Sequence, residues 1–64
     1  MPPPDVVTVA EAARLLGVSE RTVRRWVRDG GVRVYGTRPL RVSVSEVGQW
    51  RRSLRIARLL SRMG

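Results

Sequence analysis

The sequence predicts a mainly helical fold with a small β-hairpin, in which a helix-turn-helix is followed by the hairpin and by a longer helix. Three observations lead to this prediction. Apolar residues recur at three- and four-residue steps in three segments, which is the period of an amphipathic helix. Gly17 and Ser19, a helix-ending and a helix-starting residue, lie between the first two segments. Two alternating β-branched stretches flank a turn before the third segment.

A chain of 64 residues corresponds to one small domain. Three consecutive prolines make residues 1–6 an expected irregular N-terminal arm. We expect the winged helix-turn-helix domain, in which the hairpin is the wing, to span residues 7–52. The remaining residues, 53–64, are predicted to form an arginine-rich helical extension.

The first helix is predicted over Val9–Leu16. Thr8 and Glu11 form a capping box, in which the threonine hydroxyl accepts a hydrogen bond from the amide of Glu11 while the glutamate side chain reaches back. We expect its apolar face to contain Val9, Ala12, Ala13, Leu15 and Leu16.

The second helix lies within residues 19–31. Ser19 is a favourable N-cap, and Gly30 can adopt the left-handed conformation that ends a helix. Val23, Trp26 and Val27 recur on one face between them. We interpret Trp26, and Trp50 in the third helix, as core residues rather than as platforms for base stacking, because each lies on an apolar seam. The alternative for the two helices is a purely structural helical hairpin.

The hairpin is predicted to consist of strands at residues 32–35 and 40–44, joined by a turn at residues 36–39. A third helix then starts with a second capping box, Ser43 with Glu46. Its first apolar seam is Val47, Trp50, Leu54 and Ala57. A second stripe, rotated from the first, contains Ile56, Leu59, Leu60 and Met63. This stripe is either a protein-contact surface or a tail that folds back on the core.

The basic residues outnumber the acidic ones by thirteen to five, which gives a net charge of +8, and all thirteen are arginine. Such a balance in a small domain indicates a polyanionic partner, most often nucleic acid. Arginine suits this partner because its planar guanidinium donates two hydrogen bonds at once to phosphate or guanine. A GC-rich genome would also favour arginine, and composition does not separate the two explanations.

Other function classes find little support in the sequence. Cysteine and histidine are both absent, so the usual metal constellations and the commonest general base are missing. We therefore expect neither an enzyme nor a cofactor or metal site. No apolar run is long enough to span a membrane, and the N-terminus does not read as a signal peptide. We expect a cytoplasmic, nucleoid-associated protein with no membrane partner.

The candidate DNA-recognition residues belong to the second helix. Arg21, Thr22 and Arg25 lie toward its N-terminal part, which reads bases in helix-turn-helix proteins. Arg24 and Arg28 are expected to contact phosphates, and Ser19 precedes them as the cap. The alternative is a solvated arginine face without a partner.

The candidate wing residues are Arg33, Arg38 and Arg41. Arg38 lies at the predicted hairpin tip, where a side chain can enter a narrow minor groove that concentrates negative potential. Arg33 and Arg41, on the strands, would contact flanking phosphates. A loop arginine with no partner is the alternative for Arg38.

Residues 8–19 (TVAEAARLLGVS) and 21–30 (RTVRRWVRDG) resemble the excisionase-type winged helix domain, which is related to the DNA-binding domain of MerR-like regulators. The resemblance covers roughly residues 7–50. It implies a phage excisionase, or recombination directionality factor, that binds adjacent sites in an attachment region cooperatively, bends the DNA and directs a phage integrase towards excision. Its implied partners are double-stranded DNA, the integrase and neighbouring copies of itself.

The resemblance also assigns roles to residues. It implies base reading by Arg21 and Arg25, and it makes the second stripe on the third helix the candidate protein-contact surface. Two alternatives to an excisionase stay open. One is a small transcriptional regulator of the same fold without an effector domain. The other is a protein-interaction module that uses the arginine-rich C-terminal helix.

Overall fold

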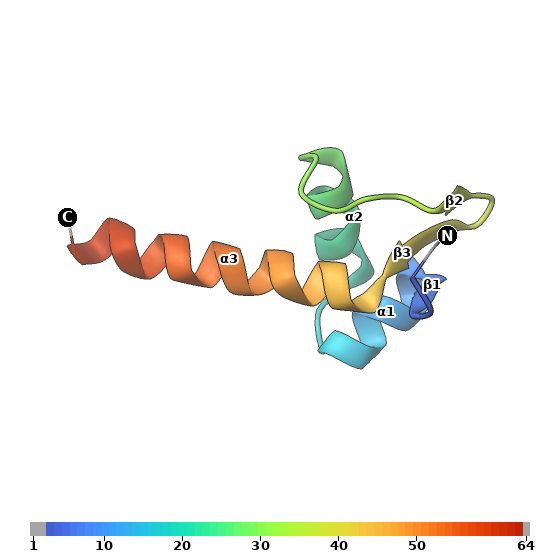
Figure 1. The fold of residues 1–64 in the computed structure, drawn as a ribbon, viewed down its shortest axis with the longest axis horizontal. Helices are drawn as coiled ribbons and strands as arrows, with labels where there is room; N and C mark the ends of the chain where they lie inside the picture. Colours follow the sequence, from blue (N-terminus) through green and yellow to red (C-terminus); the bar gives the residue numbers. More distant parts are fainter. Residues whose placement is uncertain (1–2, 64) are drawn as a thin grey trace.

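The computed structural model describes residues 3–63, apart from the side chain of Met63; Met1, Pro2 and Gly64 lie outside this range. Within it the chain forms three helices and a three-stranded antiparallel sheet (Figure 1). This confirms the predicted fold class, a winged helix-turn-helix. The elements follow in the order β1 (Val6–Thr8), α1 (Val9–Leu16), α2 (Glu20–Arg28), β2 (Gly36–Thr37), β3 (Leu40–Ser43) and α3 (Val44–Met63).

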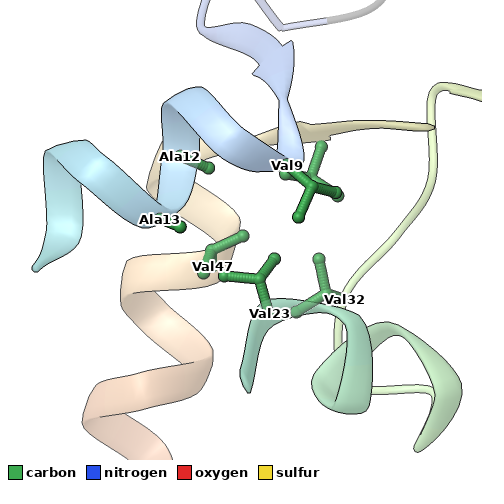
Figure 2. Close-up of a cluster of buried hydrophobic side chains, with 7 residues drawn as sticks. Val9, Ala12, Ala13, Val23, Val32 and Val47 are labelled. Carbon is green, nitrogen blue, oxygen red and sulfur yellow. The ribbon is translucent and has the colours of Figure 1, made fainter. Parts of the chain in front are cut away.

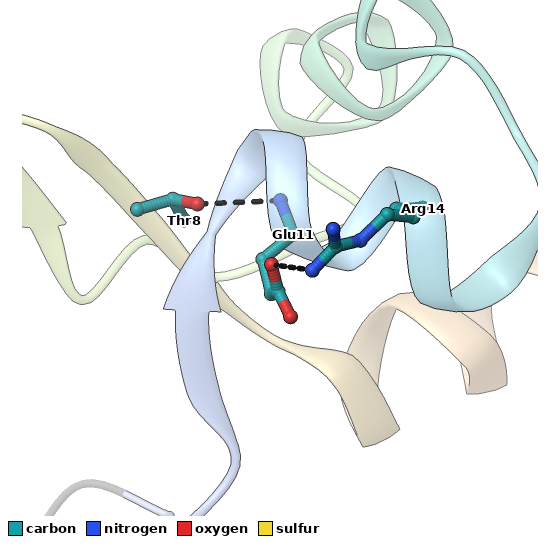
Figure 3. Close-up of polar contacts among 3 residues, drawn as sticks. All are labelled: Thr8, Glu11 and Arg14. Atoms are coloured by element: carbon teal, nitrogen blue, oxygen red, sulfur yellow. Dashed lines mark hydrogen bonds and ion pairs between the residues drawn. The ribbon is translucent and has the colours of Figure 1, made fainter.

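Helix α1 starts at the predicted cap, but only half of the capping box forms. The amide of Glu11 donates to the Thr8 hydroxyl at 3.2 Å (Figure 3). The Glu11 carboxylate does not reach back as we expected, because it pairs with Arg14 one turn further along, at 2.6 Å. An exposed pair of this kind contributes little to stability, so the Thr8 hydroxyl is the main side-chain determinant of this helix start.

The apolar face of α1 is narrower than predicted. Val9, Ala12 and Ala13 are buried and Leu16 packs beside them, whereas Leu15 is 60% exposed. The prediction for Leu15 was wrong because, at about 100° per residue, it lies well outside the stripe formed by the other four positions. The small side chains of Ala12 and Ala13 leave room for α2 and α3 to pack closely on α1.

Both helices of the helix-turn-helix end at a glycine in the left-handed region. Gly17 has φ = 69° and Gly30 has φ = 83°. After α1, the amide of Val18 donates to the carbonyl of Ala13 at 3.0 Å, and after α2 the amide of Gly31 donates across the same interval, to Trp26 at 3.1 Å. These bonds define Schellman motifs, which turn the chain sharply and satisfy carbonyls at the helix end.

The sheet has the order β1-β3-β2 and differs from the predicted hairpin in three ways. The second strand, β3, ends at Ser43 and not at residue 44, because Val44 begins α3. Residues 32–35 do not form a strand; β2 is confined to Gly36–Thr37, which pairs with Leu40 and Arg41 of β3. The reason is that Val32 is buried in the core, so the chain must cross from α2 before it can reach the sheet. On the other side of β3, Val6–Thr8 adds a strand, so Val6 does not belong to an irregular arm.

Seven small side chains form the core at the point where the helices meet the sheet (Figure 2). Val23 from α2 and Val47 from α3 are fully buried, as is Val42 from β3. Trp26 and Trp50 are partly buried and pack against this cluster, which confirms their interpretation as core residues. The other members of the cluster are Val9, Ala12, Ala13 and Val32.

The N-terminal segment determines where α3 begins. The Asp5 carboxylate accepts hydrogen bonds from the Ser43 hydroxyl at 2.8 Å, from the Ser45 amide at 2.7 Å and from the Ser45 hydroxyl. These bonds lower the pKa of Asp5 to about 2, with those from Ser45 contributing most. Ser43 also caps the helix as predicted, by accepting from the Glu46 amide at 3.3 Å, but the other half of the capping box does not form, because the Glu46 carboxylate accepts from the Tyr35 hydroxyl. Asp5, expected in an irregular arm, is therefore part of the folded domain.

Helix α3 is continuous and projects beyond the rest of the molecule, which measures 41 Å along its longest axis (Figure 1). Its first half packs on the core through Val47 and Trp50. On its second half Ile56, Leu59 and Leu60 are 50%, 54% and 64% exposed. These residues do not fold back on the core. The side chain of Met63, the fourth residue of the predicted stripe, lies outside the described residues.

Candidate nucleic-acid interface

The four arginines of α2 gather on one exposed face of the helix. Arg21, Arg24, Arg25 and Arg28 surround a shallow hollow together with Glu20. They do so because Val23, Trp26 and Val27 face the core, so the helical period leaves the arginines on the outside. The structure therefore brings the predicted recognition arginines together on a single surface.

This surface is strongly positive and largely free to bind. Within residues 3–63, Glu20 is the one carboxylate within 4 Å of these arginines, and it lies 3.8 Å from Arg24 in an exposed pair. Solvent screening makes such a pair weak, so Arg24 is also available to an incoming anion. Arg21, Arg25 and Arg28 make no ion pair among the described residues.

Ser19 and Thr22 hold the start of this surface in place. The Ser19 hydroxyl accepts from the Thr22 amide at 3.1 Å, and the two hydroxyls lie 2.9 Å apart. This confirms Ser19 as the N-cap of α2. Both side chains belong to the helix start, which places Arg21 in the first turn, at the end of the helix that carries positive partial charge.

The wing places its arginines on a separate part of the molecule. Arg38 is exposed at the turn between β2 and β3, next to Pro39 with a cis peptide bond. Arg41 is exposed on β3 as predicted, whereas Arg33 is exposed in the irregular segment before β2 and not on a strand. In Figure 1 the wing extends on the side of the molecule opposite the projecting end of α3.

A hydrogen bond attaches the base of the wing to α3. The Tyr35 hydroxyl donates to the Glu46 carboxylate, and this bond raises the pKa of the tyrosine. The amide of Tyr35 also donates to the carbonyl of Arg41 at 2.9 Å. These two hydrogen bonds attach the segment that precedes β2 to α3 and to β3, although the segment is not a strand.

A groove between α2 and α3 was not foreseen. It has a volume of about 490 Å³, and both apolar side chains and arginines line it. Its lining comprises Val18, Thr22, Arg25 and Trp26 on one side and Arg51, Leu54, Arg55, Arg58, Leu59 and Arg62 on the other. The spacing of the α3 arginines, at steps of four and three, was the sequence signal that could have indicated it.

The residues of the predicted stripe on α3 do not all line the groove. Leu59 lines the groove, whereas Ile56 and Leu60 do not. Arg51, at the inner end, is partly buried and donates to the carbonyl of Leu16 at 2.8 Å. It therefore closes the C-terminal end of α1 and joins α1 to α3.

The comparison with protein families agrees with this geometry: a model described as a helix-turn-helix domain matches residues 6–58. The chain belongs to the helix-turn-helix domain family. The match starts at the first residue of β1 and continues into the projecting half of α3. No curated protein and no solved structure matches the chain.

The family makes this chain a DNA-binding helix-turn-helix domain, and α2 is the second helix of its motif. Among residues 3–63 there is no group of three or more acidic side chains that could hold a metal ion. In the same range, no helix is long and apolar enough to cross a membrane.

Proposed function

We propose that this helix-turn-helix domain is an excisionase-type accessory protein. It binds adjacent sites on double-stranded DNA cooperatively, bends the DNA and directs a phage integrase towards excision. The single observation that carries the DNA-binding part is the face of α2, where four exposed arginines surround one hollow. The resemblance of residues 8–19 and 21–30 to excisionases supports the recombination role.

In the proposed complex, α2 lies in the major groove. Arg21, in the first turn of α2, and Arg25, one turn further along, donate paired hydrogen bonds to guanine O6 and N7, because both lie on the face that points away from the core. Arg24 and Arg28 bind phosphates and set the register of the helix on the duplex.

The wing binds beside this site. Arg38 enters the adjacent minor groove from the turn between β2 and β3, and Arg33 and Arg41 bind the flanking phosphates. Holding a major groove and a neighbouring minor groove at once favours bent DNA, because bending brings more phosphates to the protein.

Base reading is tested with alanine variants. Arg21→Ala and Arg25→Ala are expected to cost about 1–3 kcal/mol each on a duplex selected by the wild-type protein, and to relax base preference at one position each. Arg28→Ala is expected to weaken binding to all sequences alike. Arg14→Ala, on α1 and paired with Glu11, is the control. Fluorescence anisotropy measures the affinities. Unchanged affinity and preference in both Arg21 and Arg25 variants would contradict recognition by α2 and favour the protein-interaction module.

The recombination role needs a separate experiment. An integrase acting on its attachment sites is expected to excise DNA only when this protein is present, and footprinting is expected to show adjacent, cooperatively filled sites. Promoter binding with altered transcription, and no effect on excision, would favour the small regulator instead. For the integrase or a neighbouring copy, the proposed contact is the predicted stripe of Ile56, Leu59, Leu60 and Met63, the first three of which are exposed.

A further inference from the structure

We infer that the arginine row of α3, Arg55, Arg58 and Arg62, is a second DNA-binding element that contacts the phosphate backbone beside the groove entered by α2. The inference rests on the proposed docking of α2 on DNA and extends it to residues outside the helix-turn-helix and the wing. It concerns the outer rim of the groove between α2 and α3.

The row and the recognition helix share one surface. All three arginines line the same groove as Thr22 and Arg25 of α2. Arg25 also lines the hollow on the outer face of α2, together with Arg21, Arg24 and Arg28. Arg25 therefore connects the two basic surfaces. A polyanion bound to α2 that continues beyond Arg25 into the groove would contact the arginine row of α3.

The row is chemically available. Arg51, the innermost arginine of the groove, is already bound to the carbonyl of Leu16. The three arginines of the row are exposed, and among the described residues none of them lies within 4 Å of a carboxylate. No acidic residue follows Glu46 in the sequence. The outer part of the groove therefore carries unneutralised positive charge.

Its dimensions suit a nucleic-acid strand. At 1.5 Å per residue, the seven steps from Arg55 to Arg62 cover about 10 Å along the helix. Phosphates of one strand advance by about 3.4 Å each along the duplex axis, so the row spans about three of them. A continuous polyanion matches such a row better than an isolated acidic side chain does.

The apolar stripe stays free when the row binds DNA. Ile56 and Leu60 do not line the groove and are exposed. The projecting half of α3 can thus bind phosphates on one side and a protein on another.

The salt dependence of binding tests the inference. Each phosphate contact contributes about 0.9 to the slope of log K against log salt concentration. Arg58→Gln is expected to lower the slope by about 0.9, and the triple variant Arg55→Gln/Arg58→Gln/Arg62→Gln by up to about 2.7, with the order of preferred DNA sequences unchanged. Arg52→Gln is the matched control, because Arg52 is exposed on the same helix and outside the groove. Circular dichroism checks that helix content is kept.

The outcomes separate this inference from the proposed function. If Arg58→Gln and the triple variant match Arg52→Gln in slope while Arg21→Ala and Arg25→Ala lose base preference, the inference is wrong and docking by α2 stands. The same slope result, combined with loss of binding to an acidic protein partner, would assign the groove to that partner and also overturn the inference. If Arg21→Ala and Arg25→Ala have no effect either, docking by α2 itself is wrong.

Discussion

Gly31 lies against the indole ring of Trp50, and this contact joins the end of α2 to α3. A Cβ atom on residue 31 would lie 2.2 Å from Cε2 of Trp50. The ring is partly buried and packs against the core, so moving it away from residue 31 would disturb this packing. Its Nε1 is buried without a hydrogen-bond partner among the described residues, so packing rather than hydrogen bonding holds it.

We therefore expect Gly31→Ala to lower the free energy of unfolding by about 1–3 kcal/mol through overpacking. Urea unfolding followed by tryptophan fluorescence measures it. Gly48→Ala is the control, because its Cβ would meet Leu16 at an ordinary 3.8 Å, and alanine in a helix interior is expected to stabilise by about 0.5–1 kcal/mol. Equal effects of the two substitutions would show that the Trp50 contact yields easily.

Asp5 makes stability depend on acid pH. Its pKa is lowered from 3.8 to about 2 by hydrogen bonds from Ser45 and Ser43. A carboxyl with a depressed pKa stabilises the fold above its unfolded pKa, and this stabilisation disappears as the pH falls through the folded value. We expect Asp5→Ala to lower Tm at pH 7, and the difference from wild type to shrink between about pH 4 and pH 2.

Thermal unfolding over a pH series measures this difference. Asp5→Asn, which keeps one acceptor oxygen but no charge, is expected to fall between wild type and Asp5→Ala at pH 7. A Tm difference that stays constant down to pH 2 would contradict the role given to the Asp5 carboxylate.

At the scale of elements, α2 is a short helix whose two ends are both fixed. Ser19 caps its start, and the Schellman motif with Gly30 and Gly31 closes its end. Helices of nine residues are not stable alone in water, so these ends and the packing of Val23 keep the arginines on a rigid support.

Ser19→Ala is expected to cost about 1 kcal/mol of folding free energy, since it leaves the Thr22 amide without its acceptor. DNA affinity is expected to fall with it, because fraying starts at the turn that we propose reads bases. The midpoint of urea unfolding measures the first effect and fluorescence anisotropy the second. Ser53→Ala, exposed within α3, is the control and is expected to change stability by about 0.5 kcal/mol or less.

At the scale of the whole molecule, different surfaces carry different proposed contacts. We propose that DNA binds α2, the wing and the arginine row of α3, and that a protein binds the stripe around Ile56 and Leu60. A test follows from this separation. Ile56→Ser/Leu60→Ser is expected to leave single-site affinity and its salt slope unchanged, and to reduce cooperative filling of adjacent sites or integrase-dependent excision.

Electrophoretic mobility shifts on DNA with one and with two sites provide the measurement. Arg52→Gln, on the same helix, is expected to keep cooperativity. Loss of single-site binding in the double serine variant would mean that the stripe supports the DNA interface itself. If the double serine variant keeps full cooperativity and full excision, the stripe is not the protein-contact surface.

Local sequence signals predicted most of the fold. The caps at Thr8, Ser19 and Ser43 all form, and Gly17 and Gly30 both adopt the left-handed conformation. These features act within three or four residues, so they can be recognised without knowing the rest of the chain. The arginine face of α2 was predictable for the same reason, since the core stripe fixes which side chains remain outside.

The errors arose where the partner is distant in the sequence. Asp5 and Val6 were expected in a proline-rich arm. Asp5 instead accepts a hydrogen bond from the Ser45 amide, and Val6 pairs with Ser43 in the sheet. Alternation indicated a strand at residues 32–35, but burial of Val32 on the helices competes with sheet pairing and wins.

Periodicity and capping are local interactions, so the three helices, their caps and the basic face of α2 could be predicted from the sequence. Three features could not: α3 projects with its stripe exposed, Asp5 closes the start of α3, and Arg25 and Arg58 line one groove. These features depend on how β1, α2 and α3 pack around one core of small side chains. That packing follows from all the segments together and from no single one.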